Sequence, residues 1–148
     1  MRVSVKGRYA LAAMIEIARH TGQEENIAAV SIAATLGISK IYLEQAFTQL
    51  KKAGLILSAK GSRGGYQLAR STRRITAWDI LSAMEAALFD PAETTVAHNA
   101  PEIETAMQLL VFVPLDAAAK QTLSAVTLQD LLDAAERQRS SQAFMLNM

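Results

Sequence analysis

The side chains best suited to recognise another molecule lie in one predicted helix, residues 40–52. At about 100° per residue, its apolar side chains fall on one side: Leu43, Ala46, Phe47 and Leu50. The other side carries Ile41, Gln45, Thr48 and Lys52, with Glu44, Gln49 and Tyr42 along its edges. Glutamine can pair with adenine, isoleucine or threonine can contact a thymine methyl group, and lysine reaches guanine or phosphate. This composition favours base reading over simple solvation, which more often uses several Glu/Lys pairs.

A second set of basic side chains follows in a glycine-rich loop, residues 58–65. Lys60 and Arg63 stand there among three glycines, and Arg70 comes shortly afterwards. Glycines let a backbone approach a groove closely, arginine suits a narrow minor groove, and the later arginine can reach phosphates. The loop lacks the G-x-x-x-x-G-K-[ST] spacing and no helix follows it directly, which argues against a nucleotide-binding loop.

Basic charge is concentrated in the first half of the chain. Residues 1–76 carry twelve Lys and Arg against four Asp and Glu, whereas residues 77–148 carry three against ten. The formal net charge of +1 therefore hides a basic half joined to an acidic half. This asymmetry indicates that only the first half meets a polyanion, with uneven surface solvation as the alternative.

Catalytic and metal-binding chemistry has little support in the sequence. The chain has no cysteine, which excludes disulfides, thiolate metal sites and cysteine nucleophiles. No nucleophile elbow or paired-carboxylate signature is recognisable, so we expect no enzyme.

His20 is expected in the last turn of the first helix, where a cation suits the helix dipole. His98 lies near four carboxylates, those of Asp90, Glu93, Glu102 and Glu104. A metal or small-ligand site there is an alternative, although the spacing matches no strong ligand motif.

The elements that must position the base-reading helix form a helix-turn-helix pattern. Apolar spacing predicts a first helix over residues 4–21. Ser31 is expected to cap a short helix that ends at Leu36, Gly37 makes the turn, and Ser39 caps the base-reading helix. The pattern by itself is only moderately specific, because other helical hairpins share it.

Two short runs flank the glycine-rich loop and predict the strands of a hairpin. Residues 55–57 are apolar, and residues 66–68 alternate as a half-buried strand does. A basic hairpin directly after a helix-turn-helix pattern is typical of a wing. The expected fold class is therefore mainly α with a small β-hairpin, namely a winged helix-turn-helix domain.

The second half of the chain predicts a linker and a long helical segment. The spacing Thr76-x-x-Asp79 is typical of a capped helix. A polar linker with two prolines follows at residues 90–101, and a helical segment then runs to residue 124. Its run 109–115 is too apolar to remain in water, and Pro114 should kink or break the helix near residue 110.

A last helix is expected after a second capping pattern, Thr127-x-x-Asp130. It should extend to about Arg137, with residues 138–148 as a frayed tail. The expected domains are then a DNA-binding domain (1–89), a linker (90–101) and dimerisation helices with the tail (102–148). The residues expected in the dimer interface are Ile103, Met107, Leu110, Val111, Pro114 and Leu123.

The N-terminal region predicts a cytoplasmic protein. It is basic but lacks a clean signal-peptide cleavage pattern. The apolar stretch at residues 9–18 is too short to span a bilayer and contains Glu16. We therefore expect no membrane partner.

Five segments, in order along nearly the whole chain, resemble the Rrf-type winged-helix regulators of bacteria. The family includes an iron–sulfur cluster assembly regulator, a nitric-oxide-sensing repressor and a cysteine-metabolism repressor. The segments are Lys6-Gly7-Arg8-Tyr9-Ala10-Leu11, Gly37-Ile38-Ser39-x-x-Tyr42-Leu43-Glu44-Gln45-x-Phe47-x-x-Leu50-x-Lys52-Ala53-Gly54-Leu55, Gly64-Gly65-Tyr66-x-Leu68-Ala69-Arg70, Ile75-Thr76-x-x-Asp79-Ile80-Leu81 and Thr127-Leu128-x-Asp130-Leu131.

The resemblance implies a homodimer that binds a dyad-symmetric operator in double-stranded DNA. It places Tyr42, Glu44 and Gln45 at the DNA-facing start of the recognition helix, with the wing at the minor groove and a long dimerisation helix after the linker. The residues expected to contact DNA are Ser39, Lys40, Ile41, Tyr42, Glu44, Gln45, Thr48, Lys52, Lys60, Arg63 and Arg70.

The sequence departs from the family at two places. Members that bind an iron–sulfur cluster carry three cysteines in the linker and the start of the long helix, where residues 90–101 have none. We therefore expect no cofactor and no cluster. Arg63 stands where many members have glycine, which adds charge to the wing.

The leading hypothesis is a homodimeric DNA-binding transcriptional regulator whose signal is an unidentified effector or protein partner. We expect a repressor, although the sequence itself leaves the sign of regulation open. One alternative is a regulator that senses a metal or small ligand through the His98 linker. Another is an interaction module whose basic face binds an acidic protein.

Overall fold

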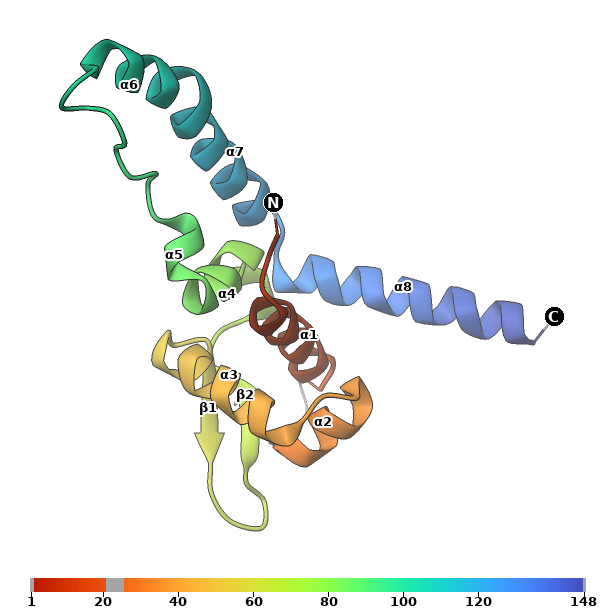
Figure 1. Ribbon diagram of the computed structural model, residues 1–148. Coiled ribbons are helices and arrows are strands. Elements are labelled where there is room, and N and C mark those ends of the chain that lie inside the picture. The colour runs from red at the N-terminus through yellow and green to blue at the C-terminus, as the bar shows by residue number, and fades with distance from the viewer. Residues whose placement is uncertain (1, 21–25, 148) are drawn as a thin grey trace.

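The chain folds into a helical body with a small hairpin and two helical extensions that leave the body in different directions (Figure 1). The computed structural model describes residues 2–20 and 26–147. The first half contains α1 (Val5–Arg19), α2 (Ala29–Leu36), α3 (Lys40–Lys52), β1 (Ile56–Ala59) and β2 (Gly65–Leu68). The second half contains the 3-10 turn η1 (Thr72–Arg74), α4 (Ala77–Met84), α5 (Ala86–Phe89), α6 (Pro101–Met107), the π-helical segment η2 (Gln108–Phe112), α7 (Val113–Ser124) and α8 (Leu128–Leu146). The predicted class, mainly α with a small β-hairpin, is confirmed.

The core forms around α1, which packs against α2, α3, α4 and α8. Its largest fully buried side chains are Phe47, Met14, Ile32, Leu43, Leu50, Leu55, Ile56, Ile75, Ile80 and Leu128. Burial of each such side chain contributes about 1.5–3 kcal/mol to folding. Gly37 makes the predicted turn between α2 and α3 with a φ of 66°, a left-handed conformation that glycine adopts without strain.

The wing comprises β1, β2 and the loop between them, residues 56–68. The two strands are antiparallel, with Ile56 opposite Leu68 and Ala59 opposite Gly65. Ile27 pairs with Tyr66 through two backbone hydrogen bonds of 2.8 and 3.0 Å. The wing is therefore fixed to the segment that precedes α2.

The arm comprises α6, η2 and α7, residues 101–124, as one continuous helical path. Pro114 at the start of α7 has no amide and its ring would clash with a regular preceding turn. The turn before it is π-helical, and the Val113 amide donates to the Gln108 carbonyl. The predicted irregularity near residue 110 is confirmed as this π segment, a known way to accommodate such a defect.

Two capping boxes begin α4 and α8, as predicted. Thr76 and Asp79 exchange side-chain-to-backbone hydrogen bonds, and Thr127 and Asp130 do the same. These two helix starts lie side by side, because the Ala77 amide donates to the Val126 carbonyl at 2.9 Å. The base of α8 is thereby built into the body next to α4.

Several predicted boundaries are wrong. Helix α2 begins at Ala29, not after Ser31, because the extended Ala28 is its N-cap and accepts the first backbone bonds. Ser39 is the N-cap of α3 but makes no side-chain capping bond. Helix α8 continues to Leu146 instead of ending near residue 137, since residues 138–146 contain neither glycine nor proline. The predicted end of the first helix at Thr21 lies outside the described residues.

Candidate nucleic-acid interface

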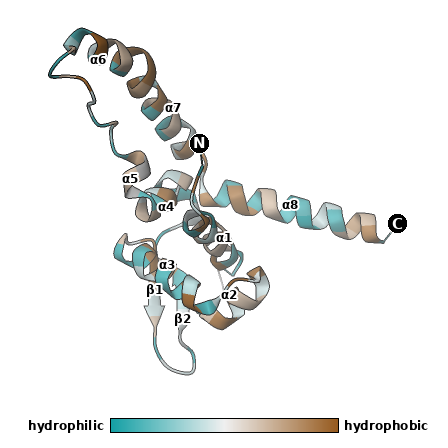
Figure 2. Ribbon diagram, viewed as in Figure 1, coloured by the Kyte–Doolittle hydropathy of each residue, from teal (hydrophilic) through white to brown (hydrophobic). Residues whose placement is uncertain are grey.

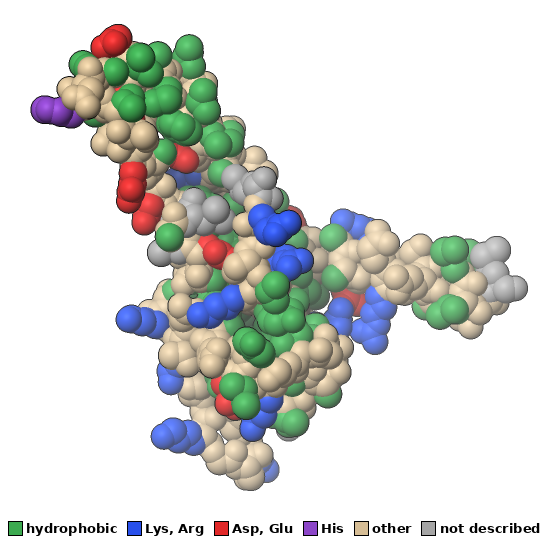
Figure 3. All heavy atoms as spheres, in the orientation of Figure 1, with side chains coloured by type: hydrophobic (Ala, Val, Ile, Leu, Met, Phe, Trp, Pro, Cys, Tyr) green, Lys and Arg blue, Asp and Glu red, His purple; other side chains and the backbone are tan. Residues whose placement is uncertain are grey.

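All eleven residues expected to contact DNA are exposed, on α3, on the wing or just after it. Ile41 is 69% exposed and Tyr42 61%, which is unusual for large side chains with apolar surface. Exposed apolar side chains beside basic ones are typical of a surface that binds another molecule. Figure 3 shows Lys and Arg side chains around the wing and the adjoining body, whereas Asp and Glu gather on the linker side.

The opposite side of α3 anchors this helix in the body. Leu43, Phe47 and Leu50 are fully buried, as the helical spacing predicted. The ring of Phe47 packs on that of Tyr66 in β2, with centroids 4.3 Å apart. This aromatic contact joins the wing to α3, so the two candidate DNA-contacting elements pack directly against each other.

The polar face of α3 has its own internal bonds. Lys40 and Glu44 form an ion pair at 3.5 Å between two exposed side chains, which contributes little to stability. The Thr48 hydroxyl donates to the Glu44 carbonyl at 2.9 Å. Because that hydroxyl is already engaged, the methyl group is the part of Thr48 best suited to contact a base.

A groove of about 380 Å³ lies between the start of α3 and the wing. Lys40, Glu44, Lys60 and Tyr66 are among its lining residues. Burial raises the pKa of the Tyr66 hydroxyl, and the negative charge of Glu44 adds to this effect. The hydroxyl therefore remains protonated and can donate a hydrogen bond to an acceptor such as a phosphate or a base.

The loop of the wing is held by a residue that the sequence did not single out. The side-chain amide of Asn26 donates to the Arg63 carbonyl at 3.1 Å. At Gly65, whose φ is 138°, a Cβ atom would collide with the backbone carbonyl of Ile27. These contacts join residues nearly forty positions apart, so no local pattern could have indicated them.

Lys51 is a second residue that the sequence analysis missed. Its ammonium group donates to the Ser58 hydroxyl at 2.7 Å and so ties α3 to β1. Lys52 is exposed at the same end of the helix. The guanidinium of Arg70 lies 3.5 Å from the Arg74 carbonyl, and this weak contact leaves most of its donors available.

The arm carries the largest run of exposed apolar side chains. Figure 2 shows hydrophobic residues along α6 and α7. Leu109, Leu110, Val111, Val113 and Leu115 are all more than half exposed, and Leu110 reaches 80%. Among the six residues expected in a dimer interface, Ile103, Leu110, Val111 and Pro114 are exposed, whereas Met107 and Leu123 are half-buried.

A buried carboxylate of α6, that of Glu104, holds the linker in place through hydrogen bonds. Glu104 is only 5% exposed. It accepts hydrogen bonds from the amides of Thr95 and Val96, at 3.0 and 2.9 Å, and from the Gln108 side chain at 3.1 Å. These bonds, that of Val96 above all, lower the pKa of the Glu104 carboxyl. Glu104 therefore folds the linker onto α6.

The Glu104 bonds predict a pH dependence of stability. A lowered pKa means that the ionised carboxylate stabilises the fold at pH values above the ordinary carboxyl pKa, and that this contribution is lost as pH falls through the lowered value. Glu104→Gln should therefore unfold more easily at pH 7 and lose less further stability between about pH 5 and pH 3. Denaturant unfolding at each pH measures this, with Glu102→Gln, an exposed carboxylate of the same helix, as control. Parallel pH profiles for Glu104→Gln and the native chain would contradict it.

The two histidines lie apart from the basic surface of α3. His20 ends α1, and its Nε2 atom lies 3.2 Å from a carboxylate oxygen of Glu16. His98 is exposed in the linker. Across residues 2–20 and 26–147, no group of three or more His, Asp or Glu side chains is placed to hold a metal ion. The alternative of a metal site at His98 gains no support from these positions.

None of the helices in the described ranges combines the length and the apolar character that crossing a bilayer requires.

Comparison with known proteins agrees with this geometry. Residues 3–134 match the model of the Rrf2 family, described as "Iron-dependent Transcriptional regulator". The HTH-type transcriptional regulator CymR of Bacillus subtilis (strain 168) is 34% identical over 146 residues, covering 99% of this chain and 100% of CymR. IscR of Xenorhabdus nematophila is 44% identical over 85 residues, which span 57% of this chain and 51% of that protein.

The likeness extends to a solved structure. The structure of CymR, described as the global cysteine regulator of B. subtilis, superposes with a TM-score of 0.75 at 35% identity and covers 90% of this chain and 98% of that one. These relatives are transcriptional regulators and not enzymes. With its winged helix-turn-helix fold and its match over most of the sequence, the chain belongs to the Rrf2 family of DNA-binding transcriptional regulators.

Proposed function

We propose that the chain is a homodimeric repressor that recognises a dyad-symmetric DNA operator. The observation that carries the proposal is the exposed face of α3 beside a basic wing, both fixed to one core. In this proposal α3 enters the major groove, where Gln45 and Thr48 read bases while Tyr42 and Glu44 contact the edge of the site. Ser39, Lys40, Ile41, Lys52 and Arg70 complete the contacts to bases and phosphates.

The wing would act at the adjacent minor groove. Lys60 and Arg63 are exposed there, and the glycines around them leave little bulk against the DNA. Arginine is favoured in narrow A·T-rich minor grooves, where the negative potential is strongest. The wing would therefore add affinity and a preference for A·T-rich flanks.

The arm would form the dimer. Its exposed apolar run is larger than a helix lying alone in water normally presents. Pairing two arms about a two-fold axis would place two α3 helices on successive major grooves, about 34 Å apart. These roles support a division into residues 1–89, 90–101 and 102–148, in which the base of α8 also packs against the body through Leu128.

The chain offers a poor donor set for the iron that the family description mentions. It has no cysteine, and Glu104, the buried carboxylate at the start of α6, already accepts three hydrogen bonds. These residues do not fit an iron–sulfur cluster. We propose a cytoplasmic regulator without a cofactor, whose signal is another molecule or a protein partner.

The test of this function is binding of the purified chain to duplex DNA at several salt concentrations. We expect a steep fall in affinity with salt and a best sequence bound at least about 1,000-fold more tightly than random DNA. A module that binds acidic proteins would share the salt dependence but would not discriminate between DNA sequences. Equal affinity for all duplexes would overturn the proposal.

The contribution of the wing can be measured separately. Arg63→Ala should lower the slope of log affinity against log salt by roughly one unit, because one phosphate or groove contact is lost. Binding should weaken most on sites with A·T-rich flanks. Arg139→Ala, which removes an exposed arginine from α8, is the matched control and should leave the slope unchanged. An unaltered slope in Arg63→Ala would show that the wing does not touch DNA.

A further inference from the structure

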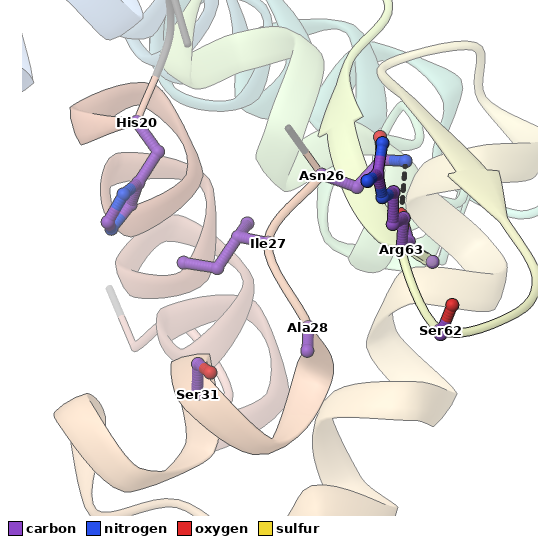
Figure 4. A pocket seen from close by; sticks show the side chains of 8 residues that line it. His20, Asn26, Ile27, Ala28, Ser31, Ser62 and Arg63 are labelled. Carbon is purple, nitrogen blue, oxygen red and sulfur yellow. Dashed lines mark hydrogen bonds between the residues drawn. The ribbon is translucent and has the colours of Figure 1, made fainter. Parts of the chain in front are cut away.

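A second hollow lies behind the wing, at the end of α1 (Figure 4). It measures about 370 Å³, within the usual range for small-molecule pockets. His20 lines it from the end of α1, Ser31 from α2, and Ser62 and Arg63 from the wing, with Asn26 beside Arg63. Three elements that are distant in the sequence thus meet around one cavity.

This pocket adjoins the groove between α3 and the wing, and Ala28 and Gly64 line both hollows. The backbone bridge between Ile27 and Tyr66 runs between the two hollows, since Ile27 lines the pocket and Tyr66 lines the groove. Helix α3 contributes to the lining of the groove but not to that of the pocket, while His20, the C-cap of α1, lines only the pocket. A ligand in the pocket would therefore leave the exposed face of α3 free.

The lining chemistry favours a negatively charged group. Arg63 supplies a guanidinium, His20 an imidazole, and Ser31 and Ser62 supply hydroxyl donors. Among the described residues that line the pocket, none is Asp or Glu. The carboxylate of Glu16, which is 5% exposed, lies 2.8 Å from Arg19 and 3.2 Å from His20 Nε2, so that imidazole nitrogen is already engaged and the charge of the pocket rests on Arg63. Arginine with hydroxyl donors is the usual combination for a carboxylate or phosphate.

We propose that this pocket binds a small metabolite through an oxyanion group, a phosphate or a carboxylate. Ile27 and Ala28 supply an apolar wall for the body of such a molecule. Binding of the oxyanion would engage Arg63 and hold the loop of the wing against the segment that Asn26 already ties to it. If the proposed DNA contact of Arg63 holds, an occupied pocket competes with the minor groove for this side chain and weakens operator binding.

Inorganic phosphate is the first probe, because it presents the oxyanion group without the rest of a metabolite. In ¹H–¹⁵N NMR of the full-length chain, we expect saturable shifts of the Ser31, Ser62 and Gly64 amides, absent with chloride at the same ionic strength. Ser31→Leu, which fills the pocket, should weaken this binding about ten-fold. Ser140→Leu, at an exposed serine of α8, is the matched control and should bind as the native chain does.

Ser62→Val serves as a second variant if Ser31→Leu disturbs α2, and it should weaken phosphate binding as well. Shifts that do not saturate, or that are equal in the native chain and both pocket variants, would overturn the proposal.

A second experiment distinguishes a free metabolite from a DNA phosphate as the source of the oxyanion. We expect a nonspecific DNA duplex to leave the Ser31 amide unshifted and to bind Ser31→Leu as tightly as the native chain. If the duplex instead shifts the same amides and binds Ser31→Leu more weakly, the pocket is a DNA-backbone site and the metabolite proposal is wrong. The phosphate titration needs no DNA, so its outcome is independent of whether the proposed operator function holds.

Discussion

Leu110→Glu should convert the protein into monomers or aggregates and abolish tight operator binding, although α3 is untouched. Leu110 is 80% exposed in the isolated chain, in the middle of the apolar run of the arm. Burial of a leucine in an interface is worth about 2 kcal/mol per copy, and a buried unpaired carboxylate adds a further penalty. Since both copies carry the change in a two-fold dimer, the effect is doubled.

Sedimentation and operator binding measure this prediction together. Leu146→Glu, which changes another highly exposed leucine at the tip of α8, is the matched control and should remain dimeric. Monomeric Leu110→Glu should bind only a half-site, with a loss of at least about 100-fold on the full operator. A Leu110→Glu protein that stays dimeric with full affinity would show that the arm is not the interface.

Gln45→Ala should cost about 1–3 kcal/mol on the best operator, roughly 5- to 150-fold in affinity. Gln45 is exposed on α3 opposite the buried Leu43 and Phe47, so its amide can pair with an adenine edge in the major groove. Loss of this pair should also relax the preference at one base position in each half-site. Binding to random DNA should change little, because phosphate contacts remain.

A site-randomised binding assay shows both effects. Gln138→Ala, at an exposed glutamine of α8, is the control and should keep the native selectivity. If Gln45→Ala selects the same sequences with the same stringency, base reading lies elsewhere on α3. Such a result would leave the fold assignment intact and would make Tyr42 and Thr48 the candidate base-reading residues.

Local patterns in the sequence predicted much of the body correctly. The capping boxes at Thr76 and Thr127 and the turn at Gly37 each depend on residues close together in the chain, so short motifs identify them. The exposure of the α3 face followed from helical spacing alone. The start of α2 was missed because an N-cap without a side-chain bond, such as Ala28, has no sequence signature.

Contacts between distant residues could not be predicted in the same way. The Asn26 bond to the wing and the ring contact between Phe47 and Tyr66 exist only after the chain has folded. In the sequence Glu104 was one of four carboxylates near His98, yet it is buried in α6 and holds the linker through its hydrogen bonds. The pocket behind the wing is likewise a product of tertiary packing.

The most direct test of the central claim is selection of bound duplexes from a random DNA pool with the purified native chain. We expect an enriched inverted repeat whose half-sites are centred about 10 base pairs, one helical turn, apart. Such a repeat requires both an α3 that reads bases and a two-fold pair of chains. Enrichment of a single unrepeated site would contradict the dimer, and a pool that remains random after selection would contradict sequence-specific DNA binding itself.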